Sequence, residues 1–240
     1  MKKLRLRYIL LVTVAALLIV PSSSQVFYRN SGQSKSVGTV ANGGLVNGFK
    51  VPYKGENYKF FSLFDYYVLG RCYLHSDIHG IILKTYEILE DEYPGYRFRL
   101  MECSKRKGGR SFPHRTHQNG TSIDFMTPLR RGGETTTRYN RVGLWRYLID
   151  FDEEGRHGRN PEISIDFDLA ALHILTLEKV ARENGYRIRK VIFETNLKDE
   201  IYNSRYGSEL LDSNIYFVRS LPENINKLHD DHYHVDFVKL

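Results

Sequence analysis

Residues 229–237 read His-Asp-Asp-His-Tyr-His-Val-Asp-Phe and lie close to the end of this 240-residue chain. Tyr233 to Val238 has the composition of a strand, and alternate residues of a strand point to the same face. His232 and His234 would then point the same way, about 7 Å apart along the strand. That separation suits one metal ligand beside one acid–base group. The stretch therefore predicts half of a metal site, carried on the last strand of a sheet.

The other half is predicted from residues 114–124, which read His-Arg-Thr-His-Gln-Asn-Gly-Thr-Ser-Ile-Asp. Zinc in proteins takes His, Asp, Glu or Cys ligands, and a catalytic site leaves one position open. His117 and Asp124 together with His234 supply two imidazoles and one carboxylate, the set of a hydrolytic zinc site. Gly120 lets the backbone turn between the first two ligands. The helical His-Glu-x-x-His motif of many zinc proteases is absent from the sequence.

A hydrolytic site of this kind also needs a group that takes a proton from the attacking water. His232 is the best placed candidate, because it would share a strand face with His234. An imidazole titrates near neutral pH, so it can accept this proton and later deliver it to the departing amine.

Two segments carry a resemblance to a known family. His-Gln-Asn-Gly-Thr-Ser-Ile-Asp-Phe, residues 117–125, and His-Asp-Asp-His-Tyr-His-Val, residues 229–235, resemble the signature segments of the penicillin-insensitive murein endopeptidases. This family belongs to the group that unites lysostaphin, D-alanyl-D-alanine peptidases and hedgehog signalling domains. The resemblance extends in layout from about Leu45 to Leu240 and includes Gly-Arg-Cys-Tyr at residues 70–73. It implies an α+β core on an antiparallel sheet that carries zinc.

The resemblance also implies roles for single residues. It makes His117, Asp124 and His234 zinc ligands, and His232 the catalytic base. His114 matches a histidine that the family keeps near the metal, as a further ligand, a group behind the ligands or a substrate contact. His229 matches another active-site histidine, for which we expect a role in stabilising the oxyanion or the substrate.

Three more residues have two interpretations each. Arg71 suits recognition of a substrate carboxylate or oxyanion, since guanidinium binds carboxylates through two hydrogen bonds; the alternative is a structural ion pair. Asp230 and Asp231 could orient the neighbouring imidazoles by accepting their second N–H. The alternative for both acids is a solvent-exposed turn.

The N-terminus has the pattern of a secretory signal peptide. Four basic residues among the first seven precede an apolar run from Tyr8 to Val20 and a Pro-Ser-Ser-Ser segment. We expect a signal peptide at 1–24, with an uncleaved anchor as the alternative, then a flexible linker at 25–42 and one domain at 43–240. Removal of those basic residues lowers the formal net charge from +7 to +3. We therefore expect an exported protein, periplasmic or extracellular, with no stable membrane span after processing and no nucleic-acid partner.

The remaining pattern predicts an α+β domain with an antiparallel sheet packed by two main helices. The helices are expected from Ser76, as N-cap, to about Asp91, and from Asp166 or Asp168 to Asn184. Strands are expected at 96–103, 122–126, 189–194 and 233–238, a hairpin at 43–52 with an Asn47-Gly48 turn, and a short helix at 198–211.

The segment from Arg130 to Pro161 is long and polar, so it is a candidate lid or substrate-binding insertion. The two cysteines, Cys72 and Cys103, could form a disulfide in an exported protein, or remain two separate buried thiols.

The motifs and the N-terminal pattern predict an exported zinc metallopeptidase, and the resemblance implies that it cleaves amide bonds in the peptide cross-links of peptidoglycan. One alternative is a D,D-carboxypeptidase or dipeptidase of the same group, which would capture a free C-terminal carboxylate. The other is a zinc-bearing module that binds the cell wall without peptidase activity.

Overall fold

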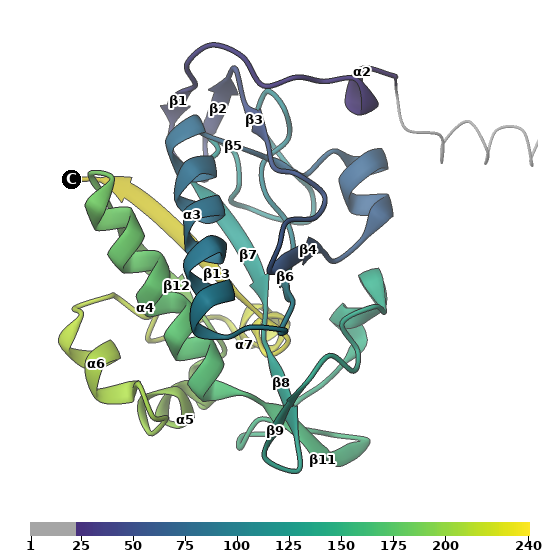
Figure 1. Ribbon diagram of the computed structural model, residues 1–240, viewed down its shortest axis with the longest axis vertical. Coiled ribbons are helices and arrows are strands. Elements are labelled where there is room, and N and C mark those ends of the chain that lie inside the picture. The colour runs from purple at the N-terminus through teal and green to yellow at the C-terminus, as the bar shows by residue number, and fades with distance from the viewer. Residues whose placement is uncertain (1–22) are drawn as a thin grey trace, which may run out of the picture.

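The computed structural model describes residues 23–240 (Figure 1). The predicted signal peptide falls, up to residue 22, outside the described residues. Among residues 23–240, no helix has both the length and the apolar character needed to cross a membrane.

A five-stranded sheet forms the centre of the molecule, in the order β12–β13–β7–β6–β4. Its pairs are antiparallel except for the outer pair β4 and β6, which is parallel. The molecule is thus an α+β protein on a mainly antiparallel sheet, which confirms the predicted fold class. The strands are β4 (Tyr58–Phe60), β6 (Phe98–Leu100), β7 (Ser122–Met126), β12 (Tyr186–Ile192) and β13 (His232–Lys239).

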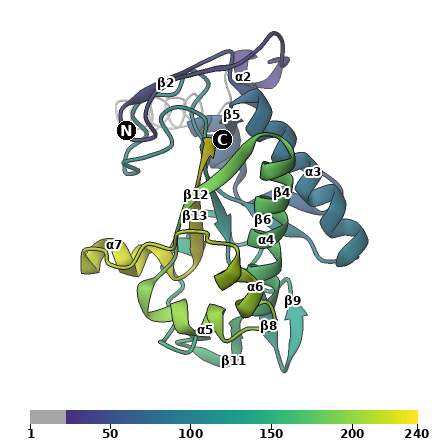
Figure 2. The same ribbon diagram turned by 90° about the vertical axis from the view of Figure 1, so that its left-hand side faces the viewer.

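Two long helices, α3 (Ser76–Glu92) and α4 (Phe167–Glu183), lie side by side against one face of this sheet (Figures 1 and 2). The cap of α4 is Asp166, whose Oδ1 accepts the Leu169 N–H at 3.1 Å. The cap of α3 is His75 and not Ser76 as predicted. His75 has an extended backbone and its Nδ1 accepts the Asp77 N–H, whereas Ser76 already lies in the first turn.

The helix-facing side of the sheet forms the hydrophobic core. Tyr233, Val235 and Phe237 alternate along β13 and are at most 3% exposed. His173 on α4 is fully buried among them, and its Nδ1 lies 2.7 Å from the Tyr233 hydroxyl. Its Nε2 lies 3.2 Å from the hydroxyl of Tyr86. Burial lowers the pKa of His173 to about 3, so this imidazole is neutral.

The N-terminal part of the domain differs from the prediction. β2 (Gly43–Val46) and β3 (Phe49–Lys50) do not form a hairpin with each other. β2 pairs instead with β1 (Lys35–Gly38), and β3 pairs with β5 (Tyr73–Leu74). The turn at Asn47-Gly48 therefore connects the β1–β2 sheet to the β3–β5 sheet. β1 lies inside the segment 25–42 that was expected to be a linker, so part of that segment packs on the domain.

The segment 130–161, expected as a lid or substrate-binding insertion, carries regular secondary structure. With the residues around it, it forms a second antiparallel sheet in the order β10–β11–β8–β9, at the opposite end of the molecule from β1 and β2 (Figures 1 and 2). In the sequence, a 3-10 helix, η2 (Gly143–Leu148), connects β9 to β10. The strands are β8 (Leu129–Arg131), β9 (Glu134–Thr136), β10 (Arg156–His157) and β11 (Asn160–Ile165).

Several shorter predictions shift at their ends. The strand predicted at 96–103 is reduced to β6, β12 begins three residues before the predicted start, and 198–211 is divided into two helices. The short helical elements are α2 (Ser23–Val26), η1 (Asp65–Leu69), η3 (Thr195–Leu197), α5 (Lys198–Tyr202), α6 (Gly207–Asp212), α7 (Glu223–Asn226) and η4 (Lys227–His229).

Cys72 and Cys103 are both fully buried and are not bonded to each other. The possible disulfide is therefore not formed, and the alternative of two separate thiols holds. Burial raises the pKa of both thiols, which leaves them protonated and unreactive.

Candidate metal centre

Two paired strands bring Asp124 and His234 together on the face of the sheet away from the helices. Asp124 lies directly opposite His234 in the register of β7 and β13, and opposed residues share one face. His234 Nδ1 lies 2.7 Å from Asp124 Oδ1, and both side chains are buried. The strand predicted from the histidine pattern thus places these two predicted ligands in contact.

The loop before β7 brings His117 to the same point. His117 has a left-handed φ of 63°, and Gly120 follows with a φ of 81°. A Cβ on Gly120 would lie 2.7 Å from the backbone nitrogen of His75, so the turn requires glycine there, as predicted. His117 Nε2 lies 3.1 Å from Asp124 Oδ2 and 3.2 Å from His234 Nδ1.

His114 lies at the more open edge of this cluster. Its side chain is 19% exposed, and its Nδ1 lies 3.9 Å from Asp124 Oδ2. Its Nε2 contacts Oε2 of the buried Glu102. Burial lowers the pKa of His114 to about 4, so the ring is neutral. With Nε2 beside Glu102, Nδ1 is the ring nitrogen of His114 that lies nearer to Asp124.

His114, His117 and Asp124 form a group that could hold a metal ion, and it is the one such group found within residues 23–240. His234 contacts two of its three members. Three imidazoles and one carboxylate thus converge, and these are ligands that zinc and other divalent transition metals take. These residues fit a metal ion well. The ring nitrogens of His117 and His234 and the carboxylate of Asp124 are buried within 3.2 Å of one another, and a shared cation would be stabilised by all three.

The second nitrogen of His234 is held by an acid that the sequence reasoning did not select. His234 Nε2 lies 2.7 Å from Asp236 Oδ1. Asp236 also accepts a hydrogen bond from Ser122 Oγ at 2.6 Å and lies 3.2 Å from Lys190 Nζ. Such a carboxylate fixes the tautomer of a ligand histidine and leaves the other nitrogen to the metal.

These contacts set the charges of the cluster. Burial lowers the pKa of His234, but the carboxylates of Asp236 and Asp124 outweigh it and raise that pKa to about 9. Burial would raise the pKa of Asp124, but His117 and His234 hold it well below its usual range. Asp124 is therefore ionised, and a metal ion would displace the Nδ1 proton of His234.

His232 lies two residues before His234 and is oriented by Asp231. His232 Nδ1 is 2.6 Å from Asp231 Oδ1. Asp231 therefore orients a neighbouring imidazole, as in the first of its two interpretations, and does not lie on an exposed turn. Burial lowers the pKa of His232, but the Asp231 carboxylate outweighs it and raises the pKa above its usual value. Because Nδ1 is held by Asp231, Nε2 is the nitrogen that can exchange a proton with a reactant.

Asp230 has a different role from the one considered. It is only 3% exposed, which rules out the exposed turn, but its Oδ2 accepts the Phe151 N–H at 3.0 Å and no imidazole. Burial raises its pKa to about 7. Asp230 therefore ties Phe151, within the 130–161 segment, to the turn just before β13.

His229 lies beside His232, with 5.0 Å between the ring centroids. Its Nδ1 is 2.7 Å from the Ile225 carbonyl oxygen, so this nitrogen carries the proton and donates it there. Burial, with the neighbouring His232, lowers the pKa of His229 to about 3. The neutral ring then offers only an acceptor at Nε2, which suits a substrate N–H better than an oxyanion.

Arg71 is buried and its guanidinium is already engaged. Nη1 lies 2.5 Å from Glu102 Oε1 and 3.6 Å from Asp65 Oδ1, while Nη2 donates to the Phe112 carbonyl. These contacts correspond to the structural ion pair considered for Arg71 rather than to a substrate contact. Through Glu102, Arg71 supports His114.

Two residues of the 130–161 segment also reach the site. Arg146 is fully buried, and its Nη2 donates to Thr127 Oγ1 at 2.7 Å and to the Asp231 carbonyl at 3.2 Å. The ring of Tyr147 meets His232 edge-on, with 5.5 Å between centroids and planes at 89°.

The sequence reasoning thus missed Glu102, Asp236, Arg146 and Tyr147. Only Asp236 had an available signal, since it continues the alternation of His232 and His234 on the same strand face.

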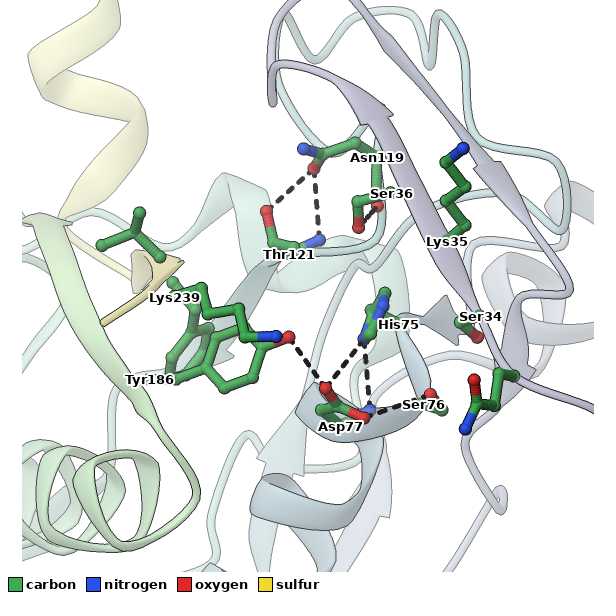
Figure 3. A pocket seen from close by; sticks show the side chains of 13 residues that line it. Ser34, Lys35, Ser36, His75, Ser76, Asp77, Asn119, Thr121, Tyr186 and Lys239 are labelled. Carbon is green, nitrogen blue, oxygen red and sulfur yellow. Dashed lines mark hydrogen bonds and ion pairs between the residues drawn. The ribbon is translucent and has the colours of Figure 1, made fainter.

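A separate cavity of about 580 Å³ lies at the N-terminus of α3 (Figure 3). His75, Asp77, Thr121, Tyr186 and Lys239 are among its lining residues, and Tyr186 donates to Asp77 at 2.8 Å. None of the four clustered ligand residues lines this cavity, so it is distinct from the candidate metal centre.

A scan of the chain against models of protein families finds no match, and a search of curated proteins finds no similar sequence. The resemblance to murein endopeptidases therefore rests on the sequence motifs alone.

Proposed function

We propose that this protein is an exported zinc metallopeptidase that hydrolyses amide bonds in the peptide cross-links of peptidoglycan. One observation carries the proposal. The buried cluster of His117, Asp124 and His234 lies on the same sheet face as His232, a histidine whose Nδ1 is fixed by a carboxylate. This combines a metal site with an adjacent acid–base group, as hydrolysis of an unactivated amide requires.

In this proposal the metal is zinc, held by His117, Asp124 and His234, with His114 as the candidate for a fourth ligand. Bound zinc would polarise the scissile carbonyl and lower the pKa of the attacking water. Metal specificity is supported by the donor set alone, because nitrogen-rich sites with one carboxylate suit zinc better than magnesium or calcium.

His232 has the geometry of the general base. Its Nδ1–H donates to Asp231, so Nε2 can accept the proton of the attacking water. The charged imidazole is stabilised by Asp231 and then delivers the proton to the amine nitrogen as the C–N bond breaks. The products are one carboxylic acid, which passes its proton to the amine at neutral pH, and one amine, and His232 returns to its neutral form.

The substrate class is supported by the resemblance of the two motifs and by the predicted signal peptide. A cross-link endopeptidase converts muropeptide dimers to monomers, whereas a D,D-carboxypeptidase releases single D-alanine residues. The contacts of Arg71 favour the first, because the buried ion pair leaves this residue poorly suited to capture a C-terminal carboxylate.

The test is digestion of purified peptidoglycan with the purified protein, followed by mass spectrometry of the muropeptides. We expect dimers to disappear and monomers to accumulate, with loss of the reaction in a chelator and recovery on addition of zinc. Release of D-alanine alone would support the carboxypeptidase instead. Binding of zinc and cell wall without any released fragment would support the non-enzymatic module.

A further inference from the structure

The 3-10 helix η2 presents one residue towards the candidate metal centre. Along this helix Trp145 is 71% exposed and Arg146 is fully buried, while the ring of Tyr147 lies edge-on to His232. Tyr147 also packs edge-on against Phe61, with 6.0 Å between ring centroids. Its ring is therefore held between the body of the domain and the predicted base.

Arg146 fixes the position of η2 relative to the site. Its guanidinium donates to the Thr127 carbonyl and hydroxyl, just after β7, and to the Asp231 carbonyl, just before β13. These are the two strands that carry Asp124 and His234. Buried hydrogen bonds from a charged donor are strong, so Tyr147 is held on the same rigid unit as the metal cluster.

The hydroxyl of Tyr147 is buried and has no hydrogen-bond partner. A buried donor without a partner is costly, and such groups in a folded protein call for an explanation. Burial raises the pKa of Tyr147 well above its usual value, and the carboxylates of Glu102, Asp124 and Asp231 raise it further. The hydroxyl thus stays protonated near these acids and remains a donor.

The two residues expected from the sequence to stabilise the oxyanion make other contacts through their donor groups. The proton of His229 is donated to the Ile225 carbonyl, and Arg71 is held by Glu102 and the Phe112 carbonyl. Tyr147, by contrast, is in edge-on contact with His232, and its hydroxyl has no hydrogen-bond partner within residues 23–240.

We propose that Tyr147 is a further catalytic residue, whose phenol O–H donates a hydrogen bond to the carbonyl oxygen of the scissile amide as that oxygen becomes the tetrahedral oxyanion. This inference rests on the proposed peptidase function. The hydroxyl transfers no proton, and its hydrogen bond strengthens as negative charge develops on the oxygen.

The test compares Tyr147→Phe with Tyr58→Phe in the full protein. Both substitutions remove a buried hydroxyl without a partner and keep the ring, but Tyr58 lies in the core, stacked on Tyr86. For Tyr147→Phe we expect kcat on a cross-linked muropeptide dimer to fall about 10²- to 10³-fold. KM and bound zinc should remain within about twofold of the native values, and Tyr58→Phe should keep the native kcat.

A binding measurement supplies a readout other than turnover. A phosphinate analogue of the cleaved peptide bond carries a tetrahedral oxyanion, so Tyr147→Phe should weaken its affinity by about the same factor as kcat/KM. Affinity for an uncleaved substrate peptide should not change.

The outcomes separate this inference from the function that it rests on. If the native protein cleaves the dimer and Tyr147→Phe cleaves it at the native rate, only the role of Tyr147 is overturned. A rise in KM with unchanged kcat would also overturn it, because the hydroxyl would then serve ground-state binding. If the native protein cleaves no wall peptide, both proposals are overturned.

Discussion

The two faces of strand β13 show how one segment can serve stability and chemistry at once. Tyr233, Val235 and Phe237 point towards the helices and are buried in the apolar core. His232, His234 and Asp236 alternate with them on the other face and are equally buried, yet they contact other titratable groups. Burial is therefore the same on both faces, and the difference lies in what each side chain meets.

His173 and His234 make this contrast specific. Both imidazoles are buried, but His173 meets two tyrosine hydroxyls and its pKa falls to about 3. His234 meets two carboxylates and its pKa rises to about 9. A histidine with hydroxyl partners fills the core, whereas one that shares carboxylates with a second histidine can bind a cation. The two faces should therefore respond differently to substitution.

The largest effect is expected for His232→Ala on the site face. The fold and the bound zinc should remain, because the proposed ligands are intact, but kcat should fall about 10²- to 10⁴-fold with the loss of the general base. Turnover of a muropeptide dimer and metal analysis of the same sample measure both quantities. Turnover at the native rate would remove His232 from the mechanism.

On the core face, Phe125→Ala should reduce stability and leave the site chemistry intact. Phe125 stacks on Tyr233 and meets His173 edge-on, and it is adjacent in sequence to the proposed ligand Asp124. We expect the free energy of unfolding to fall by about 3–5 kcal/mol, from lost burial and a cavity. Chemical denaturation measures this loss. A folded variant that had also lost its zinc would show that the two faces are not independent.

A smaller effect is expected for Asp236→Asn. The asparagine amide oxygen can still accept a hydrogen bond from His234 Nε2. The substitution removes the negative charge of Asp236, which orients His234 and makes its Nδ1 more basic. Zinc affinity should fall about 10- to 100-fold. Competition with a chromophoric chelator measures the affinity, and unchanged affinity would mean that Asp236 serves only the ion pair with Lys190.

The smallest effect concerns the pH dependence of stability. The pKa of His173 is about 3 in the folded protein and 6.5 as a model value, so the unfolded chain takes up the proton first as the pH falls. The stability that the neutral, buried His173 contributes is therefore complete above pH 6.5 and is lost progressively as the pH falls below this value. Between about pH 7.5 and 5.5 the loss amounts to about 1.4 kcal/mol. Denaturation curves of His173→Gln should show a weaker decline over this interval, and an equal decline would contradict the assignment.

Much of the fold could be predicted because its signals are local. The alternation of β13, the Asp166 cap and the left-handed Gly185 after α4 each depend on a few neighbouring residues. The pairing of β2 with β1 was missed because Asn47-Gly48 favours a hairpin locally, and the competing partner lies earlier in the chain.

About half of the candidate site could be predicted from the sequence, again because those residues lie in local motifs. His117, Asp124, His232 and His234 lie in two short motifs, so their types and spacing are visible in the sequence. Glu102 and Tyr147 reach the site through tertiary contacts alone, and nothing in the residues next to them marks them. The fully buried Arg146 could not be predicted from the sequence either, since arginine is rarely found without exposure.

The most direct test of the central claim is the zinc content of the purified protein. After equilibration with zinc and removal of unbound metal, elemental mass spectrometry should find about one zinc per native chain and almost none in folded His234→Ala. His79→Ala, which changes a histidine that packs on Phe49 away from the cluster, should keep the native content. A native protein without zinc, or a His234→Ala variant with the full content, would contradict the account.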